Sequence, residues 1–389
     1  MDMVGVRLAR RRFCSGCAAC HDACARGAIS MAEDREGFLY PRVDASKCIG
    51  CGRCREVCPA LNRGMPRRPM RTFAIKASDD VRSRSSSGGV FPLLAGQVLA
   101  SGGVVFGACF DSSFDVVHAA AATQGEVDRC RGSKYVQSRA DGIYSKVLLA
   151  LRQGRRVLFS GTPCQAAGLR RFLGHGYDGL LVVELICHGA PSRAAWRAYL
   201  KARADENRSK GGDGLVRAVE FRDKSVKSER GFTMSIVFGG GVAYSSNRDL
   251  FNIAFGCELF NRPSCHRCGQ RSLRSGADLV IGDYHGLGDS HPEFFDKNGV
   301  SAVLACTEKG LSAVEGIKPF CRWMETSYED VLRINTGLER DFPQSDRREE
   351  FMERYRDEGF DSLVTELLYT KQPRLLRWRN KMRKAFGLK

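Results

Sequence analysis

Residues 14–24 read CSGCAACHDAC and residues 48–59 read CIGCGRCREVCP, and these two stretches decide how the N-terminal part of the chain folds. Each places four cysteines at the spacing C-x2-C-x2-C-x3-C, and the second stretch repeats the first at an offset of 34 residues. In proteins with this spacing, three thiolates of one loop bind one 4Fe-4S cluster and the fourth thiolate binds a second cluster. The sequence therefore predicts a ferredoxin-type domain that holds two 4Fe-4S clusters.

The same pattern assigns the ligands of each cluster. The first cluster is bound by Cys14, Cys17, Cys20 and Cys58, and the second by Cys48, Cys51, Cys54 and Cys24. Ala25 stands where the first motif usually has proline, which alters a turn but removes no ligand. The alternative is a pair of four-cysteine zinc sites, but zinc ribbons keep their C-x2-C pairs apart, whereas these motifs run them together.

Composition limits the class of protein without choosing a function. The 389 residues are 43% hydrophobic and 27% charged, as in a soluble protein of two or three domains. The formal charge of +17 favours acidic proteins, anionic cofactors, nucleic acid or an anionic membrane face as partners. The chain has 17 cysteines but lacks an apolar signal segment or a run of roughly 20 apolar residues. We therefore expect a cytoplasmic protein that does not span a membrane.

After a basic, proline-containing linker at residues 62–71, strand-like and helix-like segments alternate. Apolar runs at 104–110, 155–160, 179–187 and 278–284 indicate strands, and residues 90–100 and 141–153 indicate helices. Residues 217–224, 232–238 and 241–246 follow as consecutive strands, which predicts an antiparallel meander. The predicted fold is a small ferredoxin-type α+β domain followed by an α/β core with antiparallel additions.

Four short segments carry groups suited to chemistry. SRSSSGGVF at residues 83–91 places serine and glycine before an apolar helix, where N–H groups can bind a phosphate or the serine can act as an ordinary cap. RGSKYVQS at residues 131–138 is a basic, aromatic loop that either holds a phosphate or is simply solvated. FSGTPCQ (159–165) and ELICHGAPS (184–192) each place a cysteine where a strand ends.

A third group of cysteines follows from these strand ends. Cys265 and Cys268 have C-x2-C spacing, which suits zinc or an iron-sulfur cluster equally. Together with Cys164 and Cys187 they would supply four ligands for a third 4Fe-4S cluster. Five further cysteines stand singly and are interpreted as structural: Cys109, Cys130, Cys257, Cys306 and Cys321.

The motifs SSSGGVF, GSKYVQS, GTPCQ, CHGAPS and RPSCHRC, followed by ADLVIGD, occur in this order along nearly the whole chain. In this respect the sequence resembles the beta-subunit family of coenzyme F420 hydrogenases and dehydrogenases, which also includes 7-hydroxymethyl chlorophyll a reductase. The resemblance implies four parts: the ferredoxin-type domain at 1–64, the N-terminal and C-terminal regions of the family's core at 65–155 and 156–345, and a helical basic tail at 346–389.

The resemblance also implies an FAD held in the α/β core beside the third cluster. The residues expected to line the flavin are Ser86, Ser87, Gly88, Gly89, Ser133, Lys134, Tyr135, Gln137, Gly161 and Thr162. Cys164, Cys187, Cys265 and Cys268 are expected to bind the neighbouring cluster. His188 is the expected catalytic residue, which hydrogen-bonds near the flavin or protonates it.

The function implied is an oxidoreductase in which a redox protein or reduced carrier exchanges single electrons with the clusters. FAD then exchanges two electrons with a small molecule such as a deazaflavin. A sugar or polyprenyl-linked substrate is a further alternative. The chain could instead be a non-catalytic electron-transfer subunit of a separate catalytic chain, or a zinc-bearing nucleic-acid binder.

The C-terminal residues 371–389 contain eight Lys or Arg and no acid, with Leu375, Trp378, Met382 and Phe386 at helical spacing. This pattern suits a peripheral contact with anionic lipid at the inner face of the membrane. It suits an amphipathic helix that packs on its own protein and exposes a basic face somewhat better. No recognised nucleic-acid-binding motif accompanies the basic residues, so no nucleic-acid partner is expected.

Overall fold

The computed structural model describes residues 6–226, 233–241 and 243–369. Its contacts divide the chain into two compact units. Unit 1 comprises Met1–Arg131, Ser138–His188 and Pro263–Asp341, and unit 2 comprises Gly132–Gln137, Gly189–Arg262 and Phe342–Lys389. The predicted domain boundaries after residues 64, 155 and 345 are not tested by this division and stay predictions.

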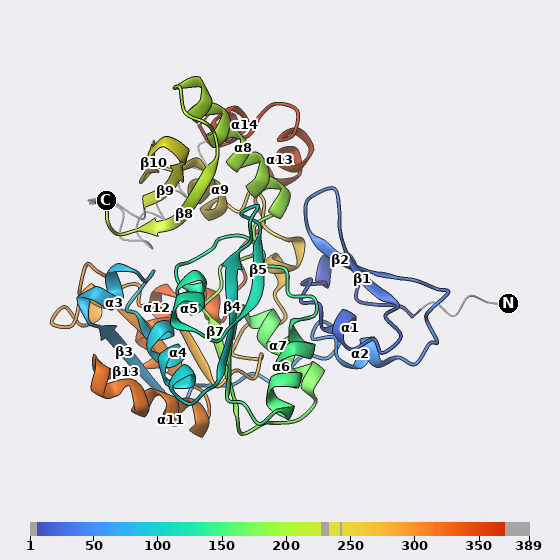
Figure 1. Cartoon of the computed structure of the whole chain (residues 1–389), viewed down its shortest axis with the longest axis vertical. Coiled ribbons are helices and arrows are strands. Elements are labelled where there is room, and N and C mark those ends of the chain that lie inside the picture. The colour runs from blue at the N-terminus through green and yellow to red at the C-terminus, as the bar shows by residue number, and fades with distance from the viewer. Residues whose placement is uncertain (1–5, 227–232, 242, 370–389) are drawn as a thin grey trace. The chain divides into compact units, whose positions relative to one another are not determined.

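The N-terminal cysteine motifs lie in a small α+β layer of unit 1, drawn in blue in Figure 1. Its elements are η1 (Arg11–Phe13), α1 (Ala19–Asp22), β1 (Ile29–Glu33), β2 (Leu39–Val43) and α2 (Arg53–Glu56). Strands β1 and β2 form an antiparallel hairpin in which Ile29 pairs with Val43. Asp34 closes the turn by accepting hydrogen bonds from the N–H groups of Glu36 and Phe38.

The core of unit 1 is an eight-stranded sheet of order β13-β3-β12-β11-β7-β6-β4-β5. Strands β4, β6, β7 and β11 are mutually parallel, and β5, β12, β3 and β13 each pair antiparallel with their neighbours. Because β12 is antiparallel to both β11 and β3, β3 runs in the same direction as β11. The strands are β3 (Arg71–Ala77), β4 (Val104–Phe110), β5 (Val116–Ala121), β6 (Val157–Gly161), β7 (Leu180–Leu185), β11 (Leu279–Asp283), β12 (Ser301–Ala305) and β13 (Cys321–Thr326). The alternating pattern of strands and helices along the sequence therefore predicted the α/β core correctly.

Helices cover both faces of this sheet because successive strand residues point to opposite sides. On β6, Val157 and Phe159 pack with helices α6 (Ile143–Arg152) and α7 (Pro163–Leu173), whereas Leu158 packs with α4 (Val90–Ala100) and α11 (Glu308–Ile317). Cys17, Ala19 and Val57 join the α6–α7 side of the core. The ferredoxin-type layer is thus attached through a continuous apolar core.

Shorter elements connect these layers. They are α3 (Asp79–Ser83), α5 (Gln124–Cys130), η3 (Pro263–Arg267), α10 (Leu287–Ser290), η4 (Lys318–Phe320), α12 (Tyr328–Ile334) and η5 (Thr336–Leu338). The predicted linker at 62–71 has no helix or strand up to Pro69 and lies against unit 1, where Arg67 N–H donates to Ser272 and Met70 N–H donates to Ala305.

Unit 2 combines helices with the predicted antiparallel meander. Its elements are α8 (Arg193–Ser209), β8 (Val216–Asp223), β9 (Thr233–Phe238), η2 (Gly239–Gly241), β10 (Ala243–Ser246), α9 (Leu250–Gly256), α13 (Arg348–Arg354) and α14 (Phe360–Tyr369). The sheet order is β10-β9-β8, with both pairs antiparallel. Aromatic rings form the core, with Trp196, Phe251 and Phe260 fully buried.

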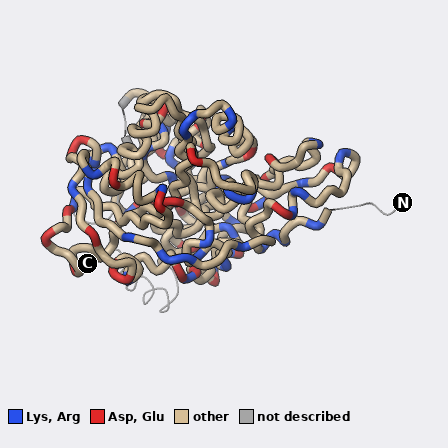
Figure 2. Tube along the Cα trace, turned by 90° about the horizontal axis from the view of Figure 1, so that it is seen from below, with Lys and Arg blue, Asp and Glu red and all other residues tan. Residues whose placement is uncertain are grey.

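Positions of Lys and Arg and of Asp and Glu are both spread along the trace (Figure 2). None of the helices in the described part of the chain is long and apolar enough to cross a membrane. The basic segment 371–389, for which a lipid contact was predicted, lies outside the described residues.

Candidate electron-transfer centre

A small cavity lies inside the ferredoxin-type layer, and four cysteines line it. They are Cys14, Cys17, Cys20 and Cys58, the set predicted to bind the first cluster. Small residues such as Gly16 and Ala18 form much of the remaining wall. Burial raises the pKa of the Cys20 thiol to about 12, and the neighbouring cysteines raise it further. Such converging thiols fit a cluster, because binding to iron removes their protons.

The two cysteine loops have the same backbone conformation. Gly16 and Gly50 occupy equivalent positions of the repeat, and both have a positive φ, of 67° and 70°. Ala18 and Gly52 are also equivalent and precede α1 and α2 with φ values of 67° and 79°. The repeat in the sequence is therefore a structural repeat, which supports a similar role for both loops.

The cysteines predicted to bind the second cluster lie nearer the surface. Cys54 is buried, and Cys48 and Cys51 are close enough to raise the pKa of its thiol further than burial does alone. Cys51 is exposed, the one exposed residue among the 17 cysteines, all of which the structure describes. Cys24 Sγ accepts a hydrogen bond from the N–H of Ala28 at 3.3 Å.

The cysteines predicted to bind a third cluster come from the carboxyl edge of the large sheet and from the η3 segment. Cys164 lies in the first turn of α7, directly after β6, and Cys187 follows β7. Burial raises the pKa of the Cys268 thiol, and the nearby Cys164 raises it further, whereas Arg271 lowers it. Arg271 also donates to the carbonyl oxygen of Cys187 at 2.8 Å, so one side chain connects both cysteine segments.

Three contacts join the first cysteine cavity to this third group. Gly168 of α7 lies against Cys17, so that a Cβ atom at Gly168 would stand 3.1 Å from Cys17 Sγ. Gln270 donates to the carbonyl oxygen of Pro59 at 3.2 Å, next to Cys58. The Tyr144 hydroxyl donates to the carbonyl oxygens of Cys17, at 2.7 Å, and Gln165, at 3.1 Å. The first and third cysteine groups are therefore neighbours within unit 1.

Among the described residues, no three His, Cys, Asp or Glu side chains are arranged to hold one metal ion. A 4Fe-4S cluster has four cysteine ligands spread around a cube of iron and sulfide, so its ligands stand farther apart than those of a zinc ion.

The ten residues predicted to line the flavin are divided between the two units. In unit 1, Ser86, Ser87, Gly88 and Gly89 precede α4, and Gly161 and Thr162 join β6 to α7. A Cβ atom at Gly88 would stand 2.2 Å from the carbonyl oxygen of Ile75, so only glycine fits there. Helix α4 begins without a side-chain cap, whereas Thr162 and Gln165 form a capping box for α7.

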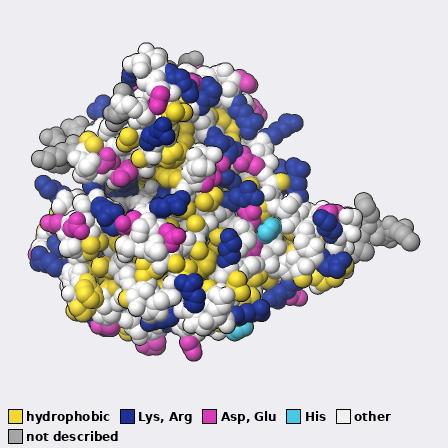
Figure 3. Space-filling view, in the orientation of Figure 1, with side chains coloured by type: hydrophobic (Ala, Val, Ile, Leu, Met, Phe, Trp, Pro, Cys, Tyr) yellow, Lys and Arg dark blue, Asp and Glu magenta, His cyan; other side chains and the backbone are white. Residues whose placement is uncertain are grey.

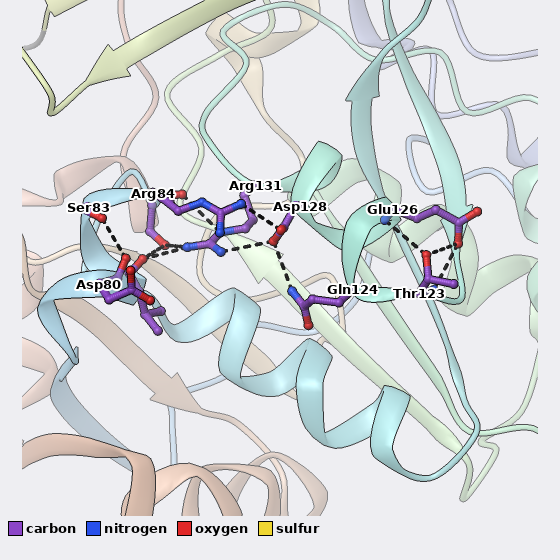
Figure 4. Close-up of polar contacts among 10 residues, drawn as sticks. Asp80, Ser83, Arg84, Thr123, Gln124, Glu126, Asp128 and Arg131 are labelled. Carbon is purple, nitrogen blue, oxygen red and sulfur yellow. Dashed lines mark hydrogen bonds and ion pairs between the residues drawn. The ribbon is translucent and has the colours of Figure 1, made fainter.

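A partly buried arginine that sequence reasoning missed holds the loop before α4. Arg131 donates to the carbonyl oxygen of Val81 at 2.8 Å, to that of Arg84 at 3.1 Å and to Ser85 Oγ at 3.2 Å. Its charge is paired with Asp128 at 3.1 Å, which also binds Arg84 (Figure 4). Arg131 directly precedes the GSKYVQS motif, but nothing in the sequence indicated its contact with residues 81–85.

The remaining flavin candidates, Ser133, Lys134, Tyr135 and Gln137, lie in unit 2. Lys134 Nζ donates to the carbonyl oxygen of Gly132 at 3.2 Å. The Tyr135 ring packs against Phe221 and Phe255, with centroids 5.4 and 5.2 Å apart. Gln137 Oε1 accepts a hydrogen bond from the buried Arg262 at 2.9 Å.

His188 follows β7 at the carboxyl edge of the sheet. Burial, together with the positive charges of His285 and Arg271, lowers the pKa of His188 to about 4, against the opposing effect of Asp283. Asp283 is the last residue of the neighbouring strand β11, and His285 follows that strand. His285 Nε2 and Asp283 Oδ2 lie 3.7 Å apart. Sequence reasoning missed both residues, although the segment GDYHG at the end of a predicted strand carries them.

Two segments of the chain match known families. Residues 154–320 match the family described as the C terminus of the coenzyme F420 hydrogenase/dehydrogenase beta subunit, and residues 13–62 match the 4Fe-4S dicluster domain. Over residues 154–320 the chain is therefore related to the beta subunit of coenzyme F420 hydrogenases and dehydrogenases. With the 4Fe-4S domain at its N-terminus, it is an iron-sulfur electron-transfer protein.

A solved structure contains a similar chain. It is the F420-reducing [NiFe] hydrogenase complex from Methanosarcina barkeri, derivatised with xenon, with 17% sequence identity and a TM-score of 0.48. The similarity covers 70% of this chain and 90% of that one. No curated protein is significantly similar in sequence.

The predicted resemblance to the F420 hydrogenase/dehydrogenase beta subunit and the presence of 4Fe-4S clusters are confirmed. The number of clusters, their individual ligands, the FAD and the role of His188 stay predictions.

Proposed function

We propose that this protein is a flavin-dependent iron-sulfur oxidoreductase. Two clusters of the ferredoxin-type domain and a third cluster bound by Cys164, Cys187, Cys265 and Cys268 relay electrons between an external redox protein or reduced carrier and FAD. A small molecule, such as a deazaflavin, is the other redox partner. The observation that carries this proposal is the contact of Cys17 with Gly168 of α7, the helix whose first turn carries Cys164.

This contact supports a continuous path for electrons. Cys17 lines the first cysteine cavity, and Cys164 lies one helical turn before Gly168. Cys164 is also among the charges that raise the pKa of Cys17, which places the two thiols near one another. Clusters bound by these cysteines would be adjacent, so an electron could pass between them without leaving the protein.

The topology of the sheet supports a flavin at its carboxyl edge. In open α/β sheets, ligands bind beyond the carboxyl ends of parallel strands. The Ser86–Gly89 loop adjoins the end of β3, and Gly161 ends β6. Three strands lie between β3 and β6, so four steps of about 4.8 Å separate the two strands. The two groups of flavin candidates therefore lie about 19 Å apart. Such an arrangement suits an elongated dinucleotide.

The residues of this chain would then have separate roles. The uncapped N–H groups at the start of α4 are suited to bind a phosphate, with the Gly88 backbone held close by Ser301 Oγ at 2.9 Å. His188, whose pKa is lowered to about 4, would hydrogen-bond to the flavin ring as a neutral imidazole. FAD, when bound, converts single-electron transfer into two-electron transfer.

The proposal is tested by anaerobic purification followed by measurement of iron, sulfide, zinc and flavin in each chain. We expect about twelve irons, from three clusters of four, and one FAD. Finding about eight irons and no flavin would reduce the protein to a ferredoxin-like carrier. Zinc in place of iron would overturn the proposal altogether.

A further inference from the structure

The surface beside the second cluster differs from the rest of the ferredoxin-type layer. Cys51, a predicted ligand of that cluster, is the exposed cysteine described above. Two residues earlier, Ile49 is 68% exposed, among the largest values for a hydrophobic side chain in the described residues. By contrast, Cys17 of the first cluster is buried and faces α7. The second cluster is therefore the one that an external protein can approach.

Positive side chains surround this exposed point. Arg26, Lys47 and Arg53 are all exposed, and each lies within two residues of a predicted ligand of the second cluster. The fold brings two of them together, because Asp44 N–H donates to the carbonyl oxygen of Ala28 at 2.8 Å and so closes the base of the β1–β2 hairpin between Arg26 and Lys47.

Nearby acids do not remove this positive charge. Lys47 pairs with Asp44 at 3.6 Å and Arg53 pairs with Glu56 at 3.2 Å, but all four side chains are at least 44% exposed. Exposed ion pairs contribute roughly 0–1 kcal/mol, so the arginine and lysine can turn toward a partner at little cost. Over residues 6–64, 11 Lys or Arg outnumber six Asp or Glu. Figure 3 shows Lys and Arg beside hydrophobic side chains on this domain.

We propose that Ile49 and Cys51, with Arg26, Lys47 and Arg53 around them, form the docking surface for a small acidic iron-sulfur protein. This inference rests on the proposed function and names the redox partner's chemistry and its place of contact. One electron leaves the partner's reduced cluster and enters the second cluster. The partner is oxidised by one electron, this chain is reduced by one electron, and no bond forms or breaks.

The size of the surface suits such an encounter. Electron-transfer complexes bury less area than stable complexes, commonly under about 1,200 Å². One exposed apolar side chain at the centre and several charges at the rim are enough for a short-lived complex. Charges at the rim act mainly by raising the association rate, and salt weakens this effect.

The test uses the full-length, cluster-loaded protein and a reduced acidic bacterial ferredoxin as the probe. Stopped-flow absorbance follows reduction of the clusters at several salt concentrations. We expect the second-order rate constant to fall as salt rises, and Arg53→Glu to lower it about tenfold at low salt. Arg35→Glu, an equal charge change at the exposed turn at the other end of the hairpin, should change it less than twofold.

A binding measurement gives a second readout that does not depend on activity. Calorimetric titration with the oxidised ferredoxin should show a several-fold weaker complex for Ile49→Ser and Arg53→Glu than for Arg35→Glu. The inference is overturned if these variants behave alike, if salt has no effect, or if the ferredoxin fails to reduce a protein that dithionite reduces.

Failure of the docking surface can be distinguished from failure of the proposed function. Dithionite bypasses the docking surface, so its reduction of clusters and flavin should be equal in wild type, Arg53→Glu and Arg35→Glu. Absence of iron or of flavin in the wild type would refute the proposed function itself. Intact clusters and flavin with equal ferredoxin kinetics in all variants would refute only the docking surface.

Discussion

Ala18 has a backbone conformation that is unfavourable for an alanine. Its φ of 67° is in the left-handed region, which costs an L-residue roughly 1–2 kcal/mol. Its methyl group is buried against Met31 and Leu39, and burial of a methyl-sized group contributes about 0.8 kcal/mol. At the equivalent Gly52 a Cβ atom would have no neighbour within 4 Å. Packing thus offsets part of the cost of alanine in one loop, whereas the other loop offers no such contact at Gly52.

At residue scale, Gly168 allows the ferredoxin-type layer to pack on α7. Glycine inside a helix normally costs about 1 kcal/mol relative to alanine, so Gly→Ala should stabilise a helix when space allows. In Gly168→Ala the new Cβ would stand 3.1 Å from Cys17 Sγ and 3.0 Å from the Tyr144 hydroxyl. We expect a loss of about 1–3 kcal/mol and loss of iron from the first cluster.

Gly96→Ala is the matched control, because a Cβ at this position of α4 meets nothing within 4 Å. It should raise the Tm, whereas Gly168→Ala should lower it. Anaerobic thermal unfolding and iron analysis of both variants measure the difference. Equal Tm values and full iron content in both would contradict the contact at Cys17.

Glu184, on β7, should make stability depend on pH. Burial raises the pKa of this carboxyl to about 7, although Ser275 and Arg271 lower it. Because the folded state holds the proton more tightly, stability is highest below the unfolded pKa near 4.3 and decreases as pH rises toward 7, by about 4 kcal/mol in total. Glu184→Gln should remove this decrease.

The measurement is the Tm of both proteins between pH 5 and 8. The glutamine variant should gain stability relative to wild type as pH rises, whereas Glu308→Gln, at the exposed start of α11, should follow wild type. Parallel Tm curves for wild type and Glu184→Gln would show that Glu184 is ionised throughout this range.

At the scale of elements, the carboxyl edge of the large sheet collects the candidate groups. Loops that follow β6, β7 and β11 carry Cys164, Cys187 and His285. The three strands are adjacent and parallel, so their carboxyl ends lie together although the loops are up to 121 positions apart in sequence. The strand order therefore creates a centre that no single segment contains.

Arg131 should control the loop before α4. Arg131→Met removes three hydrogen bonds to residues 81–85 and leaves the partly buried Asp128 with the exposed Arg84 as its ion-pair partner. We expect the loop to loosen and flavin affinity to fall about tenfold, equivalent to about 1.4 kcal/mol, while the iron content stays unchanged.

Arg84→Met is the control, because it removes only an ion pair whose arginine is 60% exposed. Flavin-to-iron ratios after dialysis should therefore fall for Arg131→Met and stay at the wild-type value for Arg84→Met. If both variants retain flavin equally, the loop does not contribute to flavin binding.

For the whole molecule, the sequence was sufficient wherever the signal was local. Cysteine spacing predicted the ferredoxin-type domain, and apolar periodicity predicted β4, α4 and the β8–β10 meander. The approach of Arg131 to Ser85, of Arg271 to Cys187, and of Gly168 to Cys17 could not be predicted. Each depends on how distant segments cross in the folded chain, and none leaves a periodic or spaced pattern.

The relay as a whole is tested by removing its middle step. Cys268→Ser should lower the iron content from about twelve to about eight, because only the third cluster loses a ligand. An external one-electron donor should still bleach the two clusters of the ferredoxin-type domain. Flavin should stay oxidised, or be reduced at least about a hundredfold more slowly, because the electron must then cross the gap without an intermediate centre.

Cys257→Ser is the control for this experiment, since Cys257 lies outside the three predicted cluster sites. It should retain the iron content and the rate of flavin reduction of the wild type. Rapid anaerobic spectroscopy separates cluster bleaching from flavin reduction in each variant. If flavin in Cys268→Ser is reduced as fast as in wild type, electrons reach it without the third cluster. The contact between Cys17 and Gly168 would then serve packing alone.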